Sequence, residues 1–122
     1  MKLKMTKIVD YGTHDSEKIL IDVLEEANLR YYLVRDTTFS TKDTISNKWT
    51  HVHKFLNQIV KTGDKVVLYT KIGTNSKKEL ANGNIEYTYY WGLGSSVWNN
   101  DGDVAVLYEI STWETLGVNS SK

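Results

Sequence analysis

The chain has 122 residues, of which 40% are hydrophobic and 25% are charged, as in one ordinary globular domain. It contains no Cys, so a disulfide framework and a thiol nucleophile are both excluded. Its 15 basic and 15 acidic side chains cancel to a net charge of zero, which argues against a protein whose whole surface attracts nucleic acid. We expect one domain over residues 1–122, with frayed ends at 1–5 and 118–122.

The amino-terminal segment, residues 1–7, is basic, but no apolar run of signal-peptide length follows it. Polar and charged side chains interrupt the next stretch at Asp10, His14, Asp15 and Glu17. The sequence also lacks 18 consecutive apolar residues, so it encodes no transmembrane helix. These features predict a soluble, cytoplasmic protein without a membrane partner.

Two segments of the first half, residues 17–27 and 49–60, fit more than one secondary structure. Apolar residues recur in both at the three-to-four spacing of an amphipathic helix. Yet Ile19, Ile21 and Val23 also alternate with polar neighbours, as in a half-buried strand. Periodicity alone therefore leaves both segments open between helix and strand.

The second half has clearer strand signals. Residues 66–70 and 87–91 are runs of β-branched and aromatic side chains, bounded by glycines. Val97 and Trp98 precede the dipeptide Asp101-Gly102, and a further apolar run covers residues 104–108. Because Asp-Gly suits the two positive φ angles of a type I′ turn, this pattern predicts a hairpin of two strands joined at Asp101-Gly102.

Residues 90–108, YWGLGSSVWNNDGDVAVLY, closely resemble the closing motif of the lamin tail domain as found in bacterial proteins. Residues 51–55 and 63–70 look like the middle hairpin of that family, and residues 29–36 look like an earlier strand. The resemblance covers roughly residues 18–110. The residues that carry its closing motif are Trp91, Gly92, Gly94, Val97, Trp98, Asn99, Asn100, Gly102 and Asp103.

The resemblance implies an all-β fold, an immunoglobulin-like β-sandwich in which both ambiguous segments are strands. A sandwich core suits the composition, since the chain has four Trp and eight Tyr and aromatic side chains fill the gap between two sheets well. We expect Trp91, Trp98 and Trp113 in that core. The alternative is a partly exposed aromatic patch that stacks on a ligand, such as a sugar ring.

The sequence offers little to support catalysis, a metal or a cofactor. His51 and His53 would share one face of a strand, but a zinc site needs further ligands and only His14 is left. The stretch 99–103 is rich in oxygen ligands, yet it lacks the length and the terminal Glu of an EF-hand loop. Nucleotide-binding and nucleophile motifs are absent as well. We expect a non-enzyme without a metal or a cofactor.

Charge is distributed unevenly along the chain. Residues 39–78 contain eight Lys against two Asp, a net +6, whereas residues 79–122 are net acidic. Our first hypothesis is a non-catalytic interaction module that binds a protein or another macromolecule through loops or edge strands. The alternative is nucleic-acid binding, in which Lys71, Lys77 and Lys78 contact the backbone and Tyr69 and Tyr87 stack on bases.

Overall fold

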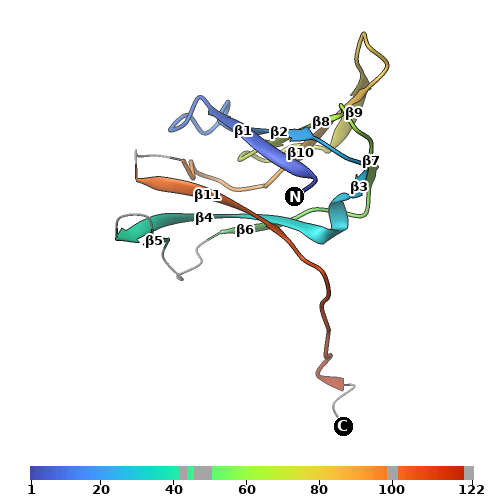
Figure 1. Cartoon of the computed structure of the whole chain (residues 1–122). Helices are drawn as coiled ribbons and strands as arrows, with labels where there is room; N and C mark the ends of the chain where they lie inside the picture. The colour runs from blue at the N-terminus through green and yellow to red at the C-terminus, as the bar shows by residue number, and fades with distance from the viewer. Residues whose placement is uncertain (42–43, 46–50, 99–101, 120–122) are drawn as a thin grey trace.

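A computed structural model describes residues 1–41, 44–45, 51–98 and 102–119. The fold is an all-β sandwich of two facing sheets (Figure 1), as the sequence predicts. The first sheet has five strands in the order β1 (Leu3–Val9), β2 (Lys18–Val23), β8 (Lys65–Tyr69), β10 (Ile85–Tyr90) and β9 (Ser76–Glu79). The second sheet is made by β11 (Asp103–Glu109), β4 (Tyr32–Thr41), β5 (Thr44–Ile45) and β6 (Val52–Lys54). A short ladder pairs β3 (Ala27–Asn28) with β7 (Ile59–Val60), and a 3-10 turn follows β3 at Leu29–Tyr31.

The two ambiguous segments are strands where the structure describes them. In β2 the burial alternates strictly, with Ile19, Ile21 and Val23 in the core and their neighbours partly exposed. This alternation is the period of a strand and not of a helix, because successive side chains of a strand point to opposite faces. Segment 51–60 contributes β6 and β7, and residues 49–50 lie outside the described part. The helical alternative is wrong for both segments.

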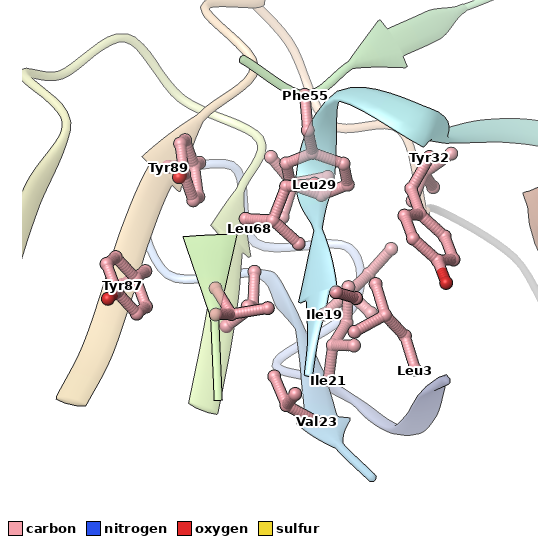
Figure 2. Packing of buried hydrophobic residues seen from close by; sticks show 14 of the residues in the cluster. Leu3, Ile19, Ile21, Val23, Leu29, Tyr32, Phe55, Leu68, Tyr87 and Tyr89 are labelled. Carbon is pink, nitrogen blue, oxygen red and sulfur yellow. The ribbon is translucent and has the colours of Figure 1, made fainter. Parts of the chain in front are cut away.

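Side chains from both sheets meet in one core (Figure 2), which includes Leu29, Tyr32 and Phe55. Trp98 belongs to this core, with only 2% of its surface exposed. Trp91 packs against the core but is only partly buried. Trp113 is 46% exposed, so the prediction that it lies in the core is wrong. It follows β11 in a segment that leaves the sandwich.

The predicted hairpin at Asp101-Gly102 is wrong, because Val97 and Trp98 form no strand and β11 pairs with β4. Asn99, Asn100 and Asp101 themselves lie outside the described residues. The reason is the buried carboxylate of Glu17, whose Oε2 accepts the backbone N–H groups of Val97 at 2.9 Å and Trp98 at 3.3 Å. Those two donors are thus bound by a side chain and not by a neighbouring strand.

Glu17 holds this loop through further hydrogen bonds and is fully buried. Its carboxylate also accepts the Thr70 hydroxyl at 2.5 Å, the Ser96 hydroxyl at 2.5 Å and the Gly12 N–H at 3.1 Å. Burial raises the pKa of the Glu17 carboxyl, but these hydrogen bonds outweigh burial and hold the pKa below its ordinary value. The residue is therefore an ionised acceptor at the centre of the loop.

Two other predictions need correction. Segments 51–55 and 63–70 do not form a hairpin, since β6 pairs with β4 while β8 pairs with β2 and with β10. The amino terminus is not frayed from Leu3 onward, because Leu3 is buried and begins strand β1. Across the described ranges, no helix is long and apolar enough to cross a membrane.

Candidate functional site

The strand register separates the residues that the sequence grouped as one binding patch. Cross-strand partners in an antiparallel ladder share a face of the sheet. Lys77 pairs with Tyr87, and Lys78 pairs with Glu86 on the adjoining positions. The register therefore directs Lys77 and Tyr87 to the inner side of the five-stranded sheet and Lys78 to its outer side. At the edge of the sheet, Lys77 also borders a pocket on the outer face, together with Tyr69 and Lys78.

The outer face carries Tyr69 and Lys71 together with Tyr90 and Lys18. The rings of Tyr69 and Tyr90 are stacked, with centroids 5.3 Å apart and an interplanar angle of 12°. The ammonium groups of Lys18 and Lys71 lie 5.0 Å and 5.3 Å from the centroid of the Tyr69 ring. Tyr69 is thus already covered by side chains of its own domain, which leaves little ring surface for a nucleic-acid base.

Two further contacts occupy this outer face. The backbone of Gly73 packs against the ring of Tyr90, because a Cβ at Gly73 would lie only 2.4 Å from two of its ring carbons. Lys78 forms an ion pair with Glu86 at 3.3 Å. The contact of Gly73 holds the loop after β8 on the sheet, the ion pair joins β9 to β10, and the Tyr69–Tyr90 stack joins β8 to β10.

On the inner side, Lys77 and Tyr87 line a cleft at the margin of the sandwich, which we call the edge cleft. Its volume is about 240 Å³. One wall comes from the segment between β6 and β7, and the other from β9, β10 and the loop before β9. The lining residues are Leu56, Asn57, Gln58, Asn75, Ser76, Lys77, Tyr87 and Tyr89.

The two tyrosines of the cleft offer little exposed ring surface. Both rings are buried, each 6% exposed, so Tyr87 does not have the exposed ring that stacking on a base requires. In Figure 2 the hydroxyl of Tyr87 points away from Leu68 and the core. Burial raises the pKa of the Tyr87 hydroxyl, and it raises the pKa of the Tyr89 hydroxyl to about 12. Both groups are therefore protonated near neutral pH and can donate a hydrogen bond.

Asn57 and Asn75 add donors to the edge cleft, whereas the NH₂ group of Gln58 donates to the carbonyl of Ile59 at 2.8 Å. Asn57 Oδ1 accepts from Asn28 at 2.6 Å, and Asn75 Oδ1 accepts the N–H of Tyr90 at 3.1 Å. These bonds leave the amide NH₂ groups of both residues as donors. The lining includes the Lys77 ammonium but not an Asp or a Glu. A carboxylate or another oxygen-rich group of a ligand is the complementary chemistry.

Strand β9 beside the cleft is the end strand of the sheet, and all four of its side chains are exposed. The N–H of Leu80 donates to the carbonyl of Asn84 at 2.7 Å, which shows which residues of β9 form hydrogen bonds with β10. Since hydrogen-bonded positions alternate in an antiparallel pair, the backbone groups of Lys77 and Glu79 point away from β10. The edge therefore presents outward N–H and C=O groups next to the donor-rich cleft.

The histidines that could ligate a metal lie elsewhere, around Trp91. His51 Nδ1 is 3.1 Å from Asp36 Oδ2, and the ring of His53 packs against Phe55 with centroids 4.8 Å apart. Within the described residues, no group of three potential metal ligands is found. Asp36 accounts for the position of the His51 ring, and Phe55 packs on the His53 ring, whose buried Nε2 has no hydrogen-bond partner among the described residues.

Sequence reasoning missed Tyr89, Asn75 and Leu56 as parts of the site. The alternation of Tyr87 and Tyr89 was a signal that both would share a face. That this face would border an open edge depends on the order of strands in the sheet, which the sequence pattern does not encode. No protein-family model, curated protein or solved structure matches the chain. The lamin tail resemblance thus stays a prediction from the motif residues.

Proposed function

We propose that this protein is a non-catalytic binding module that captures an extended, acidic segment of a protein at strand β9. The observation that carries the proposal is the open edge of β9, where backbone groups of Lys77 and Glu79 point outward beside the edge cleft. An incoming strand would pair with this backbone, and its alternate side chains would enter the cleft. Lys77 and the tyrosine hydroxyls favour a carboxylate there.

The composition of β9 supports selectivity for an acidic partner. A short edge strand that carries lysines discourages indiscriminate pairing with other sheets. Lys77 is exposed, and in the described part of the chain it takes part in no ion pair. An acidic side chain placed opposite Lys77 would relieve this barrier, whereas a neutral or basic strand would not. Backbone pairing gives affinity, and the charge gives specificity.

The test uses two labelled hexapeptides of alternating Val and Thr, one with a central Glu and the other with a central Lys. We expect fluorescence anisotropy to show binding of the acidic peptide only. Lys77→Glu should weaken that binding at least about tenfold, equivalent to about 1.4 kcal/mol. Lys78→Glu is the matched control, because Lys78 faces the opposite side of β9. Equal binding of both peptides, or an equal effect of both variants, would contradict the proposal.

A second variant tests the backbone pairing. Glu79→Pro removes an N–H that points outward and leaves the ladder with β10 intact, since Pro is tolerated at such edge positions. We expect this variant to lose peptide binding, while Glu79→Ala retains it. If instead a random DNA single strand binds with a steep dependence on salt, and reversal of Lys71, Lys77 and Lys78 abolishes it, the partner is nucleic acid.

We also propose that the sandwich is of the immunoglobulin-like, lamin-tail type and that the protein acts in the cytoplasm. The support for the family is the motif of residues 90–108, whose Val97 and Trp98 lie in the core. A profile of relatives of this chain that fails to match lamin tail domains would contradict the first statement. Recovery of the protein outside the cytoplasmic fraction would contradict the second.

A further inference from the structure

Residues 111–119, which we call the arm, leave the sandwich after β11 and run away from it (Figure 1). The N–H of Ile110 still donates to the carbonyl of Tyr31, at 2.6 Å. Every residue of the arm is exposed, including the large apolar side chain of Leu116, which is 76% exposed. An extended segment that holds apolar side chains in water has the character of a segment that binds another surface.

Near its start, the arm is fixed to the domain by Trp113. The ring of Trp113 lies 5.5 Å from the ring of Tyr31, measured between centroids. The guanidinium of Arg30 and the ammonium of Lys54 lie 5.3 Å and 5.0 Å from the centre of the Trp113 ring. These cation–π contacts hold the root of the arm in place and direct the following residues away from their own domain.

We propose that the arm of one copy of this chain occupies the β9 edge and the edge cleft of a second copy. The inference rests on the proposed function and names the partner of that same site. The arm contains one acid, Glu114, and no basic residue, whereas the cleft contains Lys77 and no acid. The charges of the two segments are therefore complementary.

The pattern of side chains also matches. In an extended chain, Glu114 and Leu116 point to the same face, because side chains alternate. The cleft combines Lys77 with the apolar side chain of Leu56, which is 62% exposed. An arm bound as a strand on β9 would place its carboxylate at the lysine and its leucine against that apolar wall.

The proposed contact is between copies. The arm leaves on the side of the four-stranded sheet, whereas β9 lies at the far end of the five-stranded sheet (Figure 1). Beyond Trp113, the six residues to position 119 span at most about 20 Å. Donation between copies joins two different surfaces, so it is heterologous and produces rings or open chains, not a simple symmetric pair.

The test is sedimentation equilibrium of the full chain over a concentration series up to about 1 mM, with charge-reversal variants. We expect the mean mass of the wild type to rise with concentration, and Glu114→Lys or Lys77→Glu alone to weaken association at least about tenfold. An equimolar mixture of the two variants should associate again, because the reversed arm meets the reversed cleft. Lys78→Glu, on the opposite face of β9, should behave as the wild type.

A wild type that remains a monomer at the highest concentration would overturn the inference, as would Glu114→Lys associating like the wild type. Glu114 is exposed, so its substitution leaves the fold intact. The acidic hexapeptide separates the two proposals. If the peptide binds at Lys77 while the chain stays monomeric, the inference fails and the proposed function stands. If neither the peptide nor the arm binds, both fail.

Discussion

Replacing Glu17 by Gln tests whether one buried carboxylate holds the loop before β11. Glu17 Oε2 accepts the N–H groups of Val97 and Trp98, and Oε1 accepts the N–H of Gly12 and the hydroxyl of Ser96. A carboxamide has nearly the same size but only one oxygen. In its better orientation, the NH₂ group faces the N–H of Gly12, and the Ser96 hydroxyl can rotate to accept from it.

The magnitude follows from these contacts. One backbone donor left without an acceptor in a buried site costs about 1–3 kcal/mol, and the remaining bonds lose the strength that an ionised acceptor gives them. We therefore expect Glu17→Gln to lower the free energy of unfolding by about 2–3 kcal/mol. For a domain of this length, that loss lowers Tm by roughly 10 °C.

The assay is urea unfolding followed by tryptophan fluorescence, which reports on the buried Trp98, together with a thermal melt. Glu25→Gln is the matched control, because Glu25 is exposed. Since the pKa of Glu17 lies below its ordinary value in the folded chain, its contribution is present at neutral pH and is lost as the pH falls through the folded pKa. A loss below about 0.5 kcal/mol at pH 7, or one no larger than in the control, would refute the reasoning.

Three further predictions concern His53, Gly73 and Asp64. Burial lowers the pKa of His53 to about 4, so between pH 6.5 and 4 only the unfolded chain binds a proton at this residue, and the free energy of unfolding falls with pH. In His53→Phe that fall should be smaller by about 3 kcal/mol, as measured by urea unfolding at each pH. Gly73→Ala should cost about 1–3 kcal/mol by thermal melting, because its Cβ would collide with Tyr90, and Tyr90→Ala should cancel most of that loss. The Asp64 carboxylate accepts the backbone N–H groups of Lys61 and Ile85 at 2.8 Å and 3.0 Å, so Asp64→Asn should cost about 2 kcal/mol of unfolding free energy; no loss would show that those donors find other acceptors.

Much of the fold could be predicted because the strands carry local signals. Residues 66–70 and 87–91 are strands β8 and β10 to within a residue or two, and the apolar run 104–108 lies inside β11. For residues 18–23, periodicity did not decide between helix and strand, since three apolar positions alternate within a segment that also fits a helix. The resemblance to the lamin tail domain implied a strand, and this segment is strand β2.

What failed depends on contacts between distant parts of the chain. The Asp101-Gly102 signal is real chemistry, but Glu17, a residue that no sequence pattern singled out, binds the amides of Val97 and Trp98. Strands β8 and β10 pair in parallel, and β9, which lies between them in sequence, pairs with the other edge of β10. Local patterns do not encode such an arrangement.

The relative placement of the residues in the predicted binding patch could not be predicted for the same reason. Lys77 and Lys78 are adjacent in sequence and therefore looked like one basic cluster. Strand geometry places them on opposite faces, and the register with Tyr87 and Glu86 decides which neighbour each lysine meets. Predicting the edge cleft would have required knowledge that β9 ends the sheet.

The hydrogen bonds of Glu17 also limit when the domain can fold during its synthesis. Glu17 precedes Val97 by 80 residues, and translation at about 5–20 residues per second delivers the second long after the first, by roughly 4–16 s. Throughout that interval the growing chain holds a carboxylate whose main donors have not been synthesised, and folds built on such long-range contacts form slowly. We expect the domain to fold only after Val97 and Trp98 have emerged from the ribosome, so its strands stay incompletely paired for several seconds during synthesis.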